Sequence, residues 1–156
     1  TMDADFSHPP ASIPKLIAGM RLPDGPSVDV MIGSRYVEEG AIEGWPFFRR
    51  VMSRMINLYA RLLLRLPIRD CSGAFRCFRV GSLARLDRGA FRAKGYALLE
   101  EILWRLQRQG CRLAETPIVF VERSEGSSKI NVKEAMTAVW VILVLGIQEW
   151  LGLRGR

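Results

Sequence analysis

Two acidic side chains near the start of the chain have the spacing of a metal site. Asp3 and Asp5 are separated by one residue, so an extended backbone projects both carboxylates from the same side. Oxygen ligands of this kind suit Mg²⁺ or Mn²⁺ bridged to a diphosphate. Two nearby aspartates are also typical of a solvated turn, and that interpretation stays open. Because almost nothing precedes the pair, we expect the segment that normally comes before it to be missing.

Arginine dominates the basic residues. The 156-residue chain has 23 lysines and arginines against 16 acidic residues, for a net charge of +7, and 19 of the 23 are arginines. Because arginine contacts phosphate in a bidentate way, this composition fits phosphorylated substrates, anionic lipid or nucleic acid. The single histidine excludes a Cys/His zinc cluster, and three cysteines without metal spacing indicate reduced thiols in a cytoplasmic protein.

Hydrophobic periodicity predicts both helices and strands, which favours an α/β fold in one domain or part of one. Val28 to Gly33 is a short apolar run ending in glycine, typical of a buried strand. Pro67 ends the helix that begins at Phe47, and Gly110 closes another. We expect helices over 13–20, 47–66, 81–86, 96–109 and 132–152, and strands over 28–33 and 112–122.

The 47–66 helix is amphipathic, with apolar residues along one face and arginines along another. Arg49 and Ser53 lie one turn apart beside the arginine stripe, which is either a solvated face or a surface for phosphate or lipid. A nucleic-acid interface would interleave aromatic and basic residues, whereas Phe48 and Tyr59 fall on the apolar face. We therefore expect no nucleic acid as partner. The stripe comprises Arg50, Arg54, Arg61 and Arg65.

The last predicted helix contains a charge-free run over 135–147, followed by Gln148, Glu149 and Trp150. A membrane span needs about 20 apolar residues, and shorter runs are more often buried or interfacial. We expect an interfacial or core-packed helix, with Trp140 and Trp150 available at the level of the lipid headgroups.

Six short motifs stand in one order along the chain. Together they resemble the dolichol-phosphate (polyprenol-phosphate) mannosyltransferases, members of the inverting family-2 glycosyltransferases, over nearly the whole chain. The motifs are Asp3-Ala4-Asp5-x-Ser7-His8-Pro9-Pro10; Gly33-Ser34-Arg35-Tyr36; Trp45 with Arg49-Arg50-x-x-Ser53-Arg54; Asp70-x-Ser72-Gly73-Ala74-Phe75-Arg76; Lys94-Gly95-Tyr96; and Pro117-Ile118-x-Phe120 with Glu122-Arg123-x-x-Gly126-x-Ser128-Lys129.

The resemblance implies a GT-A type, Rossmann-like fold with a mostly parallel sheet and flanking helices. It also implies a GDP-mannose donor, Mg²⁺ or Mn²⁺, and a polyprenyl (dolichyl) phosphate acceptor, handled on the cytoplasmic face of the membrane by a peripheral enzyme. The N-terminal nucleotide-binding half of such enzymes has no counterpart here. We therefore expect a partial GT-A domain over 1–131, a C-terminal interfacial helix over 132–156, and a missing N-terminal half as a possible partner.

The resemblance also assigns roles residue by residue. Asp3 and Asp5 match the motif that binds the metal and the donor diphosphate. Ser7 sits where close relatives often place a glutamine that helps to ligate the metal, so the implied metal ligands are Asp3, Asp5 and Ser7. A basic loop that closes over the donor and acceptor phosphates supplies two further cations, Arg123 and Lys129.

The same matching assigns Arg35, Arg49 and Ser53 to binding of the acceptor phosphate. An acceptor that is already a phosphate anion needs little deprotonation, so the reaction requires cations more than a general base. We accordingly expect His8, which precedes two prolines, to cap or pack rather than to catalyse.

The candidate catalytic residues are Asp5, Arg35 and Asp70. Asp70, Arg76 and Glu101 match positions near the active site of the family. Two other functions stay open at this point. One is transfer of another sugar, such as glucose from UDP-glucose, and the other is a non-catalytic, membrane-associated module that binds lipid phosphate.

Overall fold

A computed structural model describes residues 1–5, 7–21, 27–95, 97–122 and 132–152. Its central strand, β1 (Val30–Ser34), pairs in parallel with β4 (Leu113–Pro117) and antiparallel with β3 (Arg76–Phe78). A second, two-stranded sheet joins β2 (Ala41–Glu43) to β5 (Val119–Val121) in parallel. The fold is therefore mixed α/β with a sheet that contains parallel strands, and the GT-A assignment stays a prediction.

The expected strand over 112–122 is in fact two strands, and the break between them connects the two sheets. Pro117 ends β4, and the next residue, Ile118, donates its N–H to the Ser34 carbonyl and accepts from the Ala41 N–H. Proline has no N–H to continue a ladder, so the chain changes partner there. The sequence analysis predicted no strand between 33 and 47, yet this segment contains β2, which pairs with β5 after the change of partner.

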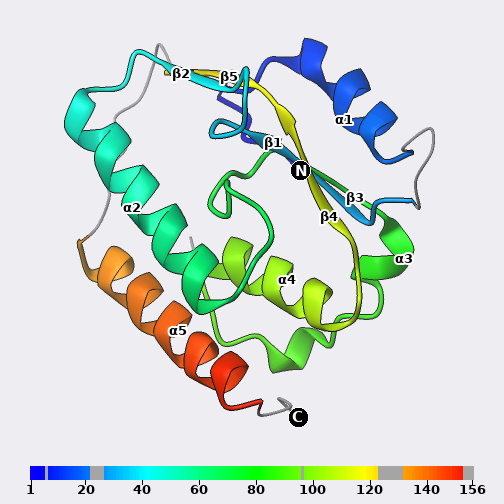
Figure 1. The fold of residues 1–156 in the computed structure, drawn as a ribbon, viewed down its shortest axis with the longest axis vertical. Helices are drawn as coiled ribbons and strands as arrows, with labels where there is room; N and C mark the ends of the chain where they lie inside the picture. The colour runs from blue at the N-terminus through cyan, green and yellow to red at the C-terminus, as the bar shows by residue number, and fades with distance from the viewer. Residues whose placement is uncertain (6, 22–26, 96, 123–131, 153–156) are drawn as a thin grey trace.

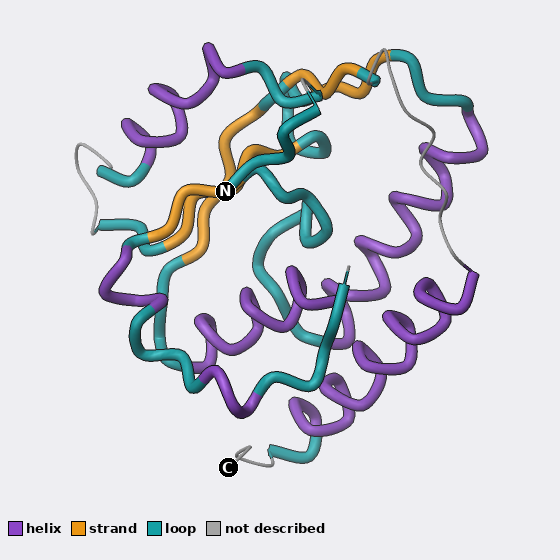
Figure 2. The backbone as a smooth tube through the Cα atoms, turned by 180° about the vertical axis from the view of Figure 1, so that it is seen from behind, coloured by secondary structure: helices purple, strands orange, loops and turns teal. Residues whose placement is uncertain are grey.

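Helices cover both faces of the three-stranded sheet (Figures 1 and 2). On one face lies α1 (Ile13–Gly19), whose Leu16 packs with Met31 of β1. On the other lie the three longest helices, and Val30 and Ile32 of β1 pack into the core that they form. The alternation of β1 side chains thus supplies both cores. These helices are α2 (Phe47–Leu63), α4 (Ala97–Arg108) and α5 (Val132–Trp150).

Short elements complete the chain: α3 (Val80–Leu83) and 3₁₀ turns at Pro10–Ser12 and Arg88–Ala90. The helix expected over 47–66 stops at Leu63, because the chain turns through Arg65 with a positive φ of 52° before it reaches Pro67. The helices predicted over 96–109 and 132–152 agree with α4 and α5 to within two residues.

The last helix, α5, packs against α2 and α4 and contributes Ile142 and Leu145 to the core. It approaches α2 so closely that a Cβ on Gly146 would lie 2.8 Å from Cβ of Leu63. Across the described residues, no helix has the length and apolar character to cross a membrane. The inner side of α5 is therefore core-packed, while its outer side exposes Met136, Val139, Trp140, Ile147 and Trp150.

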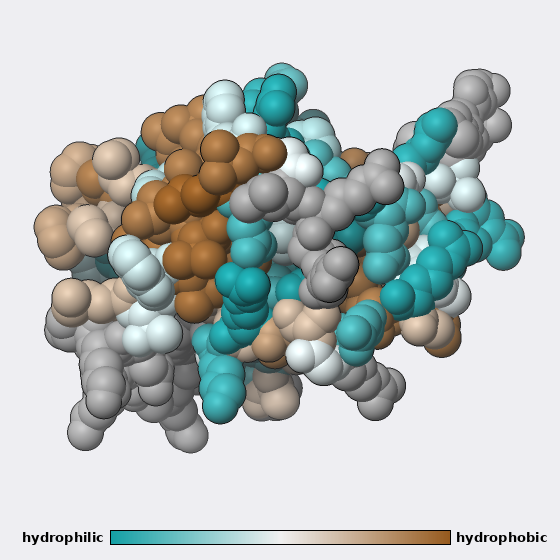
Figure 3. All heavy atoms as spheres, turned by 90° about the horizontal axis from the view of Figure 1, so that it is seen from below, coloured by the Kyte–Doolittle hydropathy of each residue, from teal (hydrophilic) through white to brown (hydrophobic). Residues whose placement is uncertain are grey.

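The second helix, α2, is oriented with its apolar face outward. Its inward residues include Asn57 and Ala60, both buried. Most side chains of the predicted apolar face are exposed, including Phe48 at 72%, whereas Tyr59 is partly buried and Leu66, beyond the helix, is buried. The neighbouring Phe47 is 79% exposed. Viewed from below, apolar side chains gather on the side of the molecule where α2 and α5 lie (Figure 3). The exposed apolar residues of α2 are Phe47, Phe48, Val51, Met52, Met55, Leu58 and Leu62.

Candidate active site

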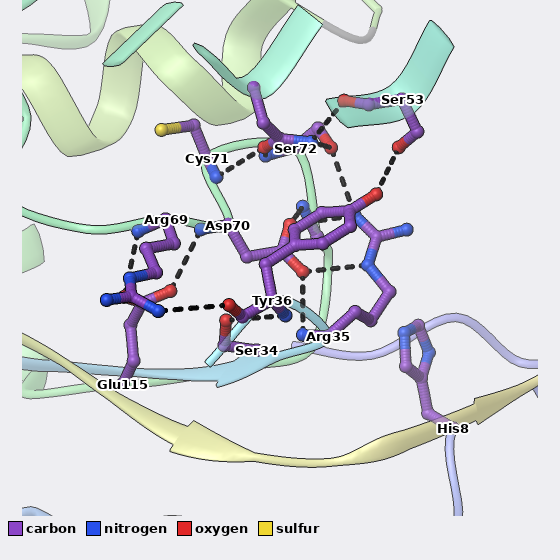
Figure 4. A network of polar contacts seen from close by, with 12 residues as sticks. His8, Ser34, Arg35, Tyr36, Ser53, Arg69, Asp70, Cys71, Ser72 and Glu115 are labelled. Atoms are coloured by element: carbon purple, nitrogen blue, oxygen red, sulfur yellow. Dashed lines mark hydrogen bonds and ion pairs between the residues drawn. The ribbon is translucent and has the colours of Figure 1, made fainter. Parts of the chain in front are cut away.

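Arg35, the residue after β1, forms a buried bidentate ion pair with Asp70 (Figure 4). Its Nε and Nη2 donate to the two carboxylate oxygens, each at 2.7 Å, and its backbone N–H donates to Oδ2 at 3.1 Å. Burial disfavours the charge on Arg35, but the hydrogen bonds and charge of Asp70 outweigh this effect and raise its pKa. The ion pair fixes the guanidinium at the end of the central strand.

The loop that carries Asp70 is held from α2 by one buried amide. Asn57 Oδ1 accepts from the backbone N–H groups of Cys71 at 2.7 Å and Ser72 at 3.1 Å. Its Nδ2 donates to Ser72 Oγ, and the same oxygen accepts from Arg35 Nη2, each at 3.0 Å. Burial also raises the pKa of the Cys71 thiol, which therefore stays protonated. Asn57 thus couples the helix to the Arg35 site.

The other strands hold the same loop from the opposite side. Glu115 on β4 accepts from the N–H groups of Arg69 and Asp70, both at 2.8 Å. On β3, Arg76 donates through Nη2 to the Cys71 carbonyl at 2.6 Å and through Nη1 to the Leu99 carbonyl at 2.7 Å. Arg76 therefore holds the loop that carries Asp70, and its expected place near the active site stays a prediction.

Glu101 holds a different segment. Its buried carboxylate accepts from the backbone N–H groups of Arg92 and Ala93 and pairs with Arg105. None of these contacts reaches the Asp70 loop. Asp70 itself is fully buried and acts on Arg35, so the structure gives it a positioning role, and its catalytic assignment stays a prediction.

The two residues of α2 assigned to the acceptor phosphate have different partners. Arg49 forms an ion pair with Glu122 and lies over the ring of Trp45, with Cζ 4.1 Å from the centroid. Ser53 accepts a 2.6 Å hydrogen bond from the hydroxyl of Tyr36, whose pKa is raised by burial. An incoming anion must therefore compete with Glu122 for Arg49, whereas Tyr36 fixes the Ser53 hydroxyl beside Arg35.

A cavity of about 330 Å³ opens between α2 and the segment after β1. No acidic side chain is among the residues that line it. Arg54 and Arg61 make no ion pair with any residue that the structure describes, so their charge is available to a ligand. The sequence analysis placed both in the arginine stripe but found no signal for Arg69, which joins them only through folding. The lining residues are Arg35, Tyr36, Val37, Gly40, Arg54, Asn57, Leu58, Arg61 and Arg69.

The acidic motif at the start of the chain gathers with the only histidine. Asp3, Asp5 and His8 each present a ligand atom within 4.8 Å of the other two. Ser7 is buried, and its hydroxyl and N–H bond Asp5 Oδ1 at 2.5 and 3.1 Å, so it orients that carboxylate. Two carboxylates and an imidazole are a donor set that fits a divalent cation. A ligand role for Ser7 stays a prediction.

His8 is buried among aromatic rings, which confirms that it packs. Its ring centroid lies 5.1 Å from that of Phe75 and 5.4 Å from that of Phe120. Burial lowers its pKa, against the opposing effect of Asp3 and Asp5. Phe120 also contacts the Arg35 guanidinium, with Cζ 5.6 Å from the ring centroid. One ring therefore separates the metal motif from the buried arginine.

Arg123 and Lys129, assigned to the basic loop, lie outside the described residues.

Two curated proteins are similar in sequence to this chain over almost its whole length. The chain is 37% identical over 158 residues to a polyprenol monophosphomannose synthase of Mycolicibacterium smegmatis. It is 36% identical over 156 residues to an undecaprenyl-phosphate mannosyltransferase of Micrococcus luteus. The chain is a homologue of polyprenyl-phosphate mannosyltransferases. Searched against protein-family models, it matches none.

The alignments to both mannosyltransferases cover 99% of this chain, which confirms the resemblance predicted from the six motifs. They cover only 55% and 62% of the two relatives, so the chain spans little more than half the length of the mannosyltransferases it matches. The relatives' names identify both of them as enzymes of mannosyl transfer, and the six motifs lie within the region that they share with this chain.

A buried carboxyl beneath the site gives a prediction about pH. Glu100 is 3% exposed, and burial raises its pKa from 4.5 to about 7. Among the described residues, neither its Oε2 nor the Nε of Arg76 has a hydrogen-bond partner, and burial lowers the pKa of Arg76 to about 10. Ionisation of Glu100 is thus easier in the unfolded chain, so the folded state loses stability as the pH rises from 4.5 to 7.

We predict that Glu100→Gln removes this loss. Relative to wild type, its free energy of unfolding should improve by about 3 kcal/mol between pH 4.5 and pH 8, as a pKa shift of this size implies. Urea denaturation across that range measures the difference. Glu38→Gln, at an exposed position, is the control, and its free energy of unfolding should vary with pH in parallel with that of wild type. Parallel profiles for Glu100→Gln and wild type would contradict the prediction.

Proposed function

We propose that the protein containing this chain transfers mannose from GDP-mannose to a polyprenyl phosphate, with inversion, at the membrane surface and with Mg²⁺ or Mn²⁺. The observation that carries the proposal is the shared ring of Phe120, which contacts His8 beside the carboxylate pair and Arg35 beside the basic cavity. A cation-binding group and an anion-binding group are thereby adjacent. That is the arrangement needed to bring a donor diphosphate and an acceptor phosphate together.

On the donor side, Asp3 and Asp5 would hold the cation, as the resemblance implies, and Ser7 hydrogen-bonds to Asp5. When bound, the cation neutralises charge that develops on the leaving diphosphate. Arg123 and Lys129 are proposed to close over the same phosphates. These groups support the breaking of the bond between the anomeric carbon and the diphosphate oxygen.

On the acceptor side, the protein supplies cations rather than a base. The acceptor phosphate oxygen is already an anion, and it forms the new bond on the opposite face of the sugar as the diphosphate leaves. Arg35 is held by Asp70 through Nε and Nη2, which leaves the Nη1 edge for an anion. Arg49 and Ser53 extend this surface along α2, and the cavity arginines add positive charge.

The membrane surface is proposed as the partner of the exposed apolar residues of α2 and α5. The aromatic side chains Phe47, Phe48, Trp140 and Trp150 have the amphipathic setting of interfacial helices, and arginines flank them on α2. Because the acceptor's tail resides in the bilayer, this surface would present α2, with Arg49 and Ser53, to the lipid phosphate. It agrees with a peripheral, cytoplasmic-face enzyme.

The alternatives predict different donors or none. A UDP-glucose-dependent enzyme would use the same acceptor side, and a lipid-phosphate binding module would need no metal. The direct test is a transfer assay with the complete protein, polyprenyl phosphate in vesicles, and labelled GDP-mannose or UDP-glucose. We expect mannosyl-lipid only, and loss of at least nine-tenths of the rate in Asp5→Ala at every Mg²⁺ or Mn²⁺ concentration, because a metal ligand is worth more than about 1.4 kcal/mol to the transition state. Glucosyl transfer, or metal-independent turnover, would contradict the proposal.

A second prediction concerns the acceptor site. Arg49→Ala should raise the acceptor KM by at least about tenfold, since charge-assisted hydrogen bonds are worth about 1.5–3 kcal/mol, and Ser53→Ala should raise it less. Glu122→Gln should lower the acceptor KM, because it removes the carboxylate that occupies Arg49. Titration of polyprenyl phosphate at saturating donor measures all three. Equal acceptor KM values in Arg49→Ala and wild type would remove Arg49 from the site.

A third prediction tests membrane association. The double variant Phe47→Ser, Phe48→Ser should reduce cosedimentation of the complete protein with anionic vesicles by about tenfold or more, because each exposed aromatic contributes about 1.5–3 kcal/mol on burial. Val80→Ser changes an equally exposed apolar residue on α3 and serves as control. If the double variant binds vesicles as wild type does, the exposed face of α2 is not the membrane-binding surface.

A further inference from the structure

We infer that His8 is the third protein ligand of the divalent cation held by Asp3 and Asp5, through its Nδ1 atom. This would give a mixed oxygen and nitrogen site that prefers Mn²⁺ over Mg²⁺. The inference deepens the proposed function, because it rests on the cation that the proposal places at the carboxylate pair. It changes the chemical identity of the site from all-oxygen to mixed.

The orientation of the His8 ring is the first observation. His8 is 3% exposed and is held between Phe75 and Phe120, so its nitrogens have fixed directions. Nδ1 faces Asp3: it accepts from the Asp3 N–H at 3.4 Å and lies 4.0 Å from Asp3 Oδ2. An Nδ1 that accepts this hydrogen bond carries a lone pair and leaves the proton on Nε2, and the same atom lies within 4.8 Å of a carboxylate oxygen of both Asp3 and Asp5.

That hydrogen bond is long, which makes it easy to replace. N–H donors in proteins usually lie about 2.7–3.2 Å from their acceptors, so a 3.4 Å contact holds the lone pair only weakly. A cation between Nδ1 and the carboxylates would take over the lone pair without moving the packed ring. His8 therefore has the geometry of a preorganised ligand with a weak substitute partner.

Ser7 is not an equivalent donor in this structure. Its side chain is 1% exposed, and its Oγ donates to Asp5 Oδ1 at 2.5 Å. A hydroxyl used in this way orients a ligand from the outer shell, as such partners commonly do. The other carboxylate, on Asp3, is 54% exposed and has Oδ2 4.0 Å from His8 Nδ1, so it faces both the solvent and the ring nitrogen.

The metal preference follows from the donor atoms. Mg²⁺ binds oxygen almost exclusively and requires near-ideal octahedral geometry at about 2.0–2.1 Å, whereas imidazole suits transition metals. Replacing one oxygen by an imidazole nitrogen therefore weakens Mg²⁺ relative to Mn²⁺. We expect the chain to bind Mn²⁺ at least about tenfold more tightly than Mg²⁺, since changes in the ligand environment commonly alter metal affinity 10–100-fold.

A spectroscopic test can identify the coordinating nitrogen. Mn²⁺ is titrated into the complete protein and into its His8→Phe variant, and pulsed electron paramagnetic resonance is recorded with natural-abundance protein and with protein labelled with ¹⁵N only at histidine. We expect a directly coordinated ¹⁴N signal that is replaced by ¹⁵N in the labelled sample. Bound Mn²⁺ without histidine nitrogen coupling, or no bound Mn²⁺ at all, would overturn the inference.

Two substitutions separate ligation from packing. His8→Phe keeps a ring between Phe75 and Phe120 but removes the nitrogen, so it should weaken Mn²⁺ binding by about tenfold or more. His8→Gln offers an amide oxygen and should reduce the ratio of Mn²⁺ to Mg²⁺ affinity. Circular dichroism confirms folding in each case. If His8→Phe binds Mn²⁺ as wild type does, His8 only packs.

These readouts distinguish the inference from the proposed function. Mn²⁺ bound by Asp3 and Asp5 without nitrogen coupling would leave the mannosyltransferase proposal standing and remove His8 from the site. If the complete protein instead binds Mn²⁺ with nitrogen coupling but transfers no mannose, His8 stays a metal ligand and the mannosyltransferase proposal is wrong.

Discussion

The buried carboxylate of Asp70 is the interaction on which the rest of the structure depends. It accepts from three donors of Arg35 and from the N–H of Gly73, with no exposure to solvent. Removing one partner of a buried ion pair costs about 3–5 kcal/mol, because the other charge is left without compensation. The same contact fixes the end of the central strand and aims Arg35, so fold and site cannot be separated here.

This constraint explains why α2 is oriented with its apolar face outward. The loop that carries Asp70 needs Asn57 to accept its N–H groups, so the inward side of the helix must be partly polar. The helix consequently turns its larger apolar side chains away from the sheet, while Ala60 and the following Leu64 fill the core. Orientation is decided by hydrogen bonds that must be satisfied, and the exposed apolar face is the result.

Local patterns predicted those elements whose signals are local. The apolar run of β1 and the periodicity of α4 and α5 needed no knowledge of their neighbours. By contrast, Ala41–Glu43 forms a strand only because β5 pairs with it after Pro117. The side of α2 that packs against the core could not be predicted either, because periodicity shows that a helix has two faces but not which one meets the core. Among site residues, Asp3, Asp5 and Arg35 carried visible signals, whereas the roles of Asn57, Tyr36 and Arg69 arise from contacts between distant segments.

The exposed apolar face also has a colloidal consequence. A chain that displays Phe47, Phe48 and their neighbours on one side attracts its own copies through that side. The opposing force is the net charge of +7, which keeps like molecules apart as long as the field extends across the gap between them. Added salt shortens that range to about 8 Å at physiological ionic strength and to about 3 Å at 1 M. Dispersion in water and attachment to an anionic surface thus depend on the same positive charge, and dilute buffer favours both.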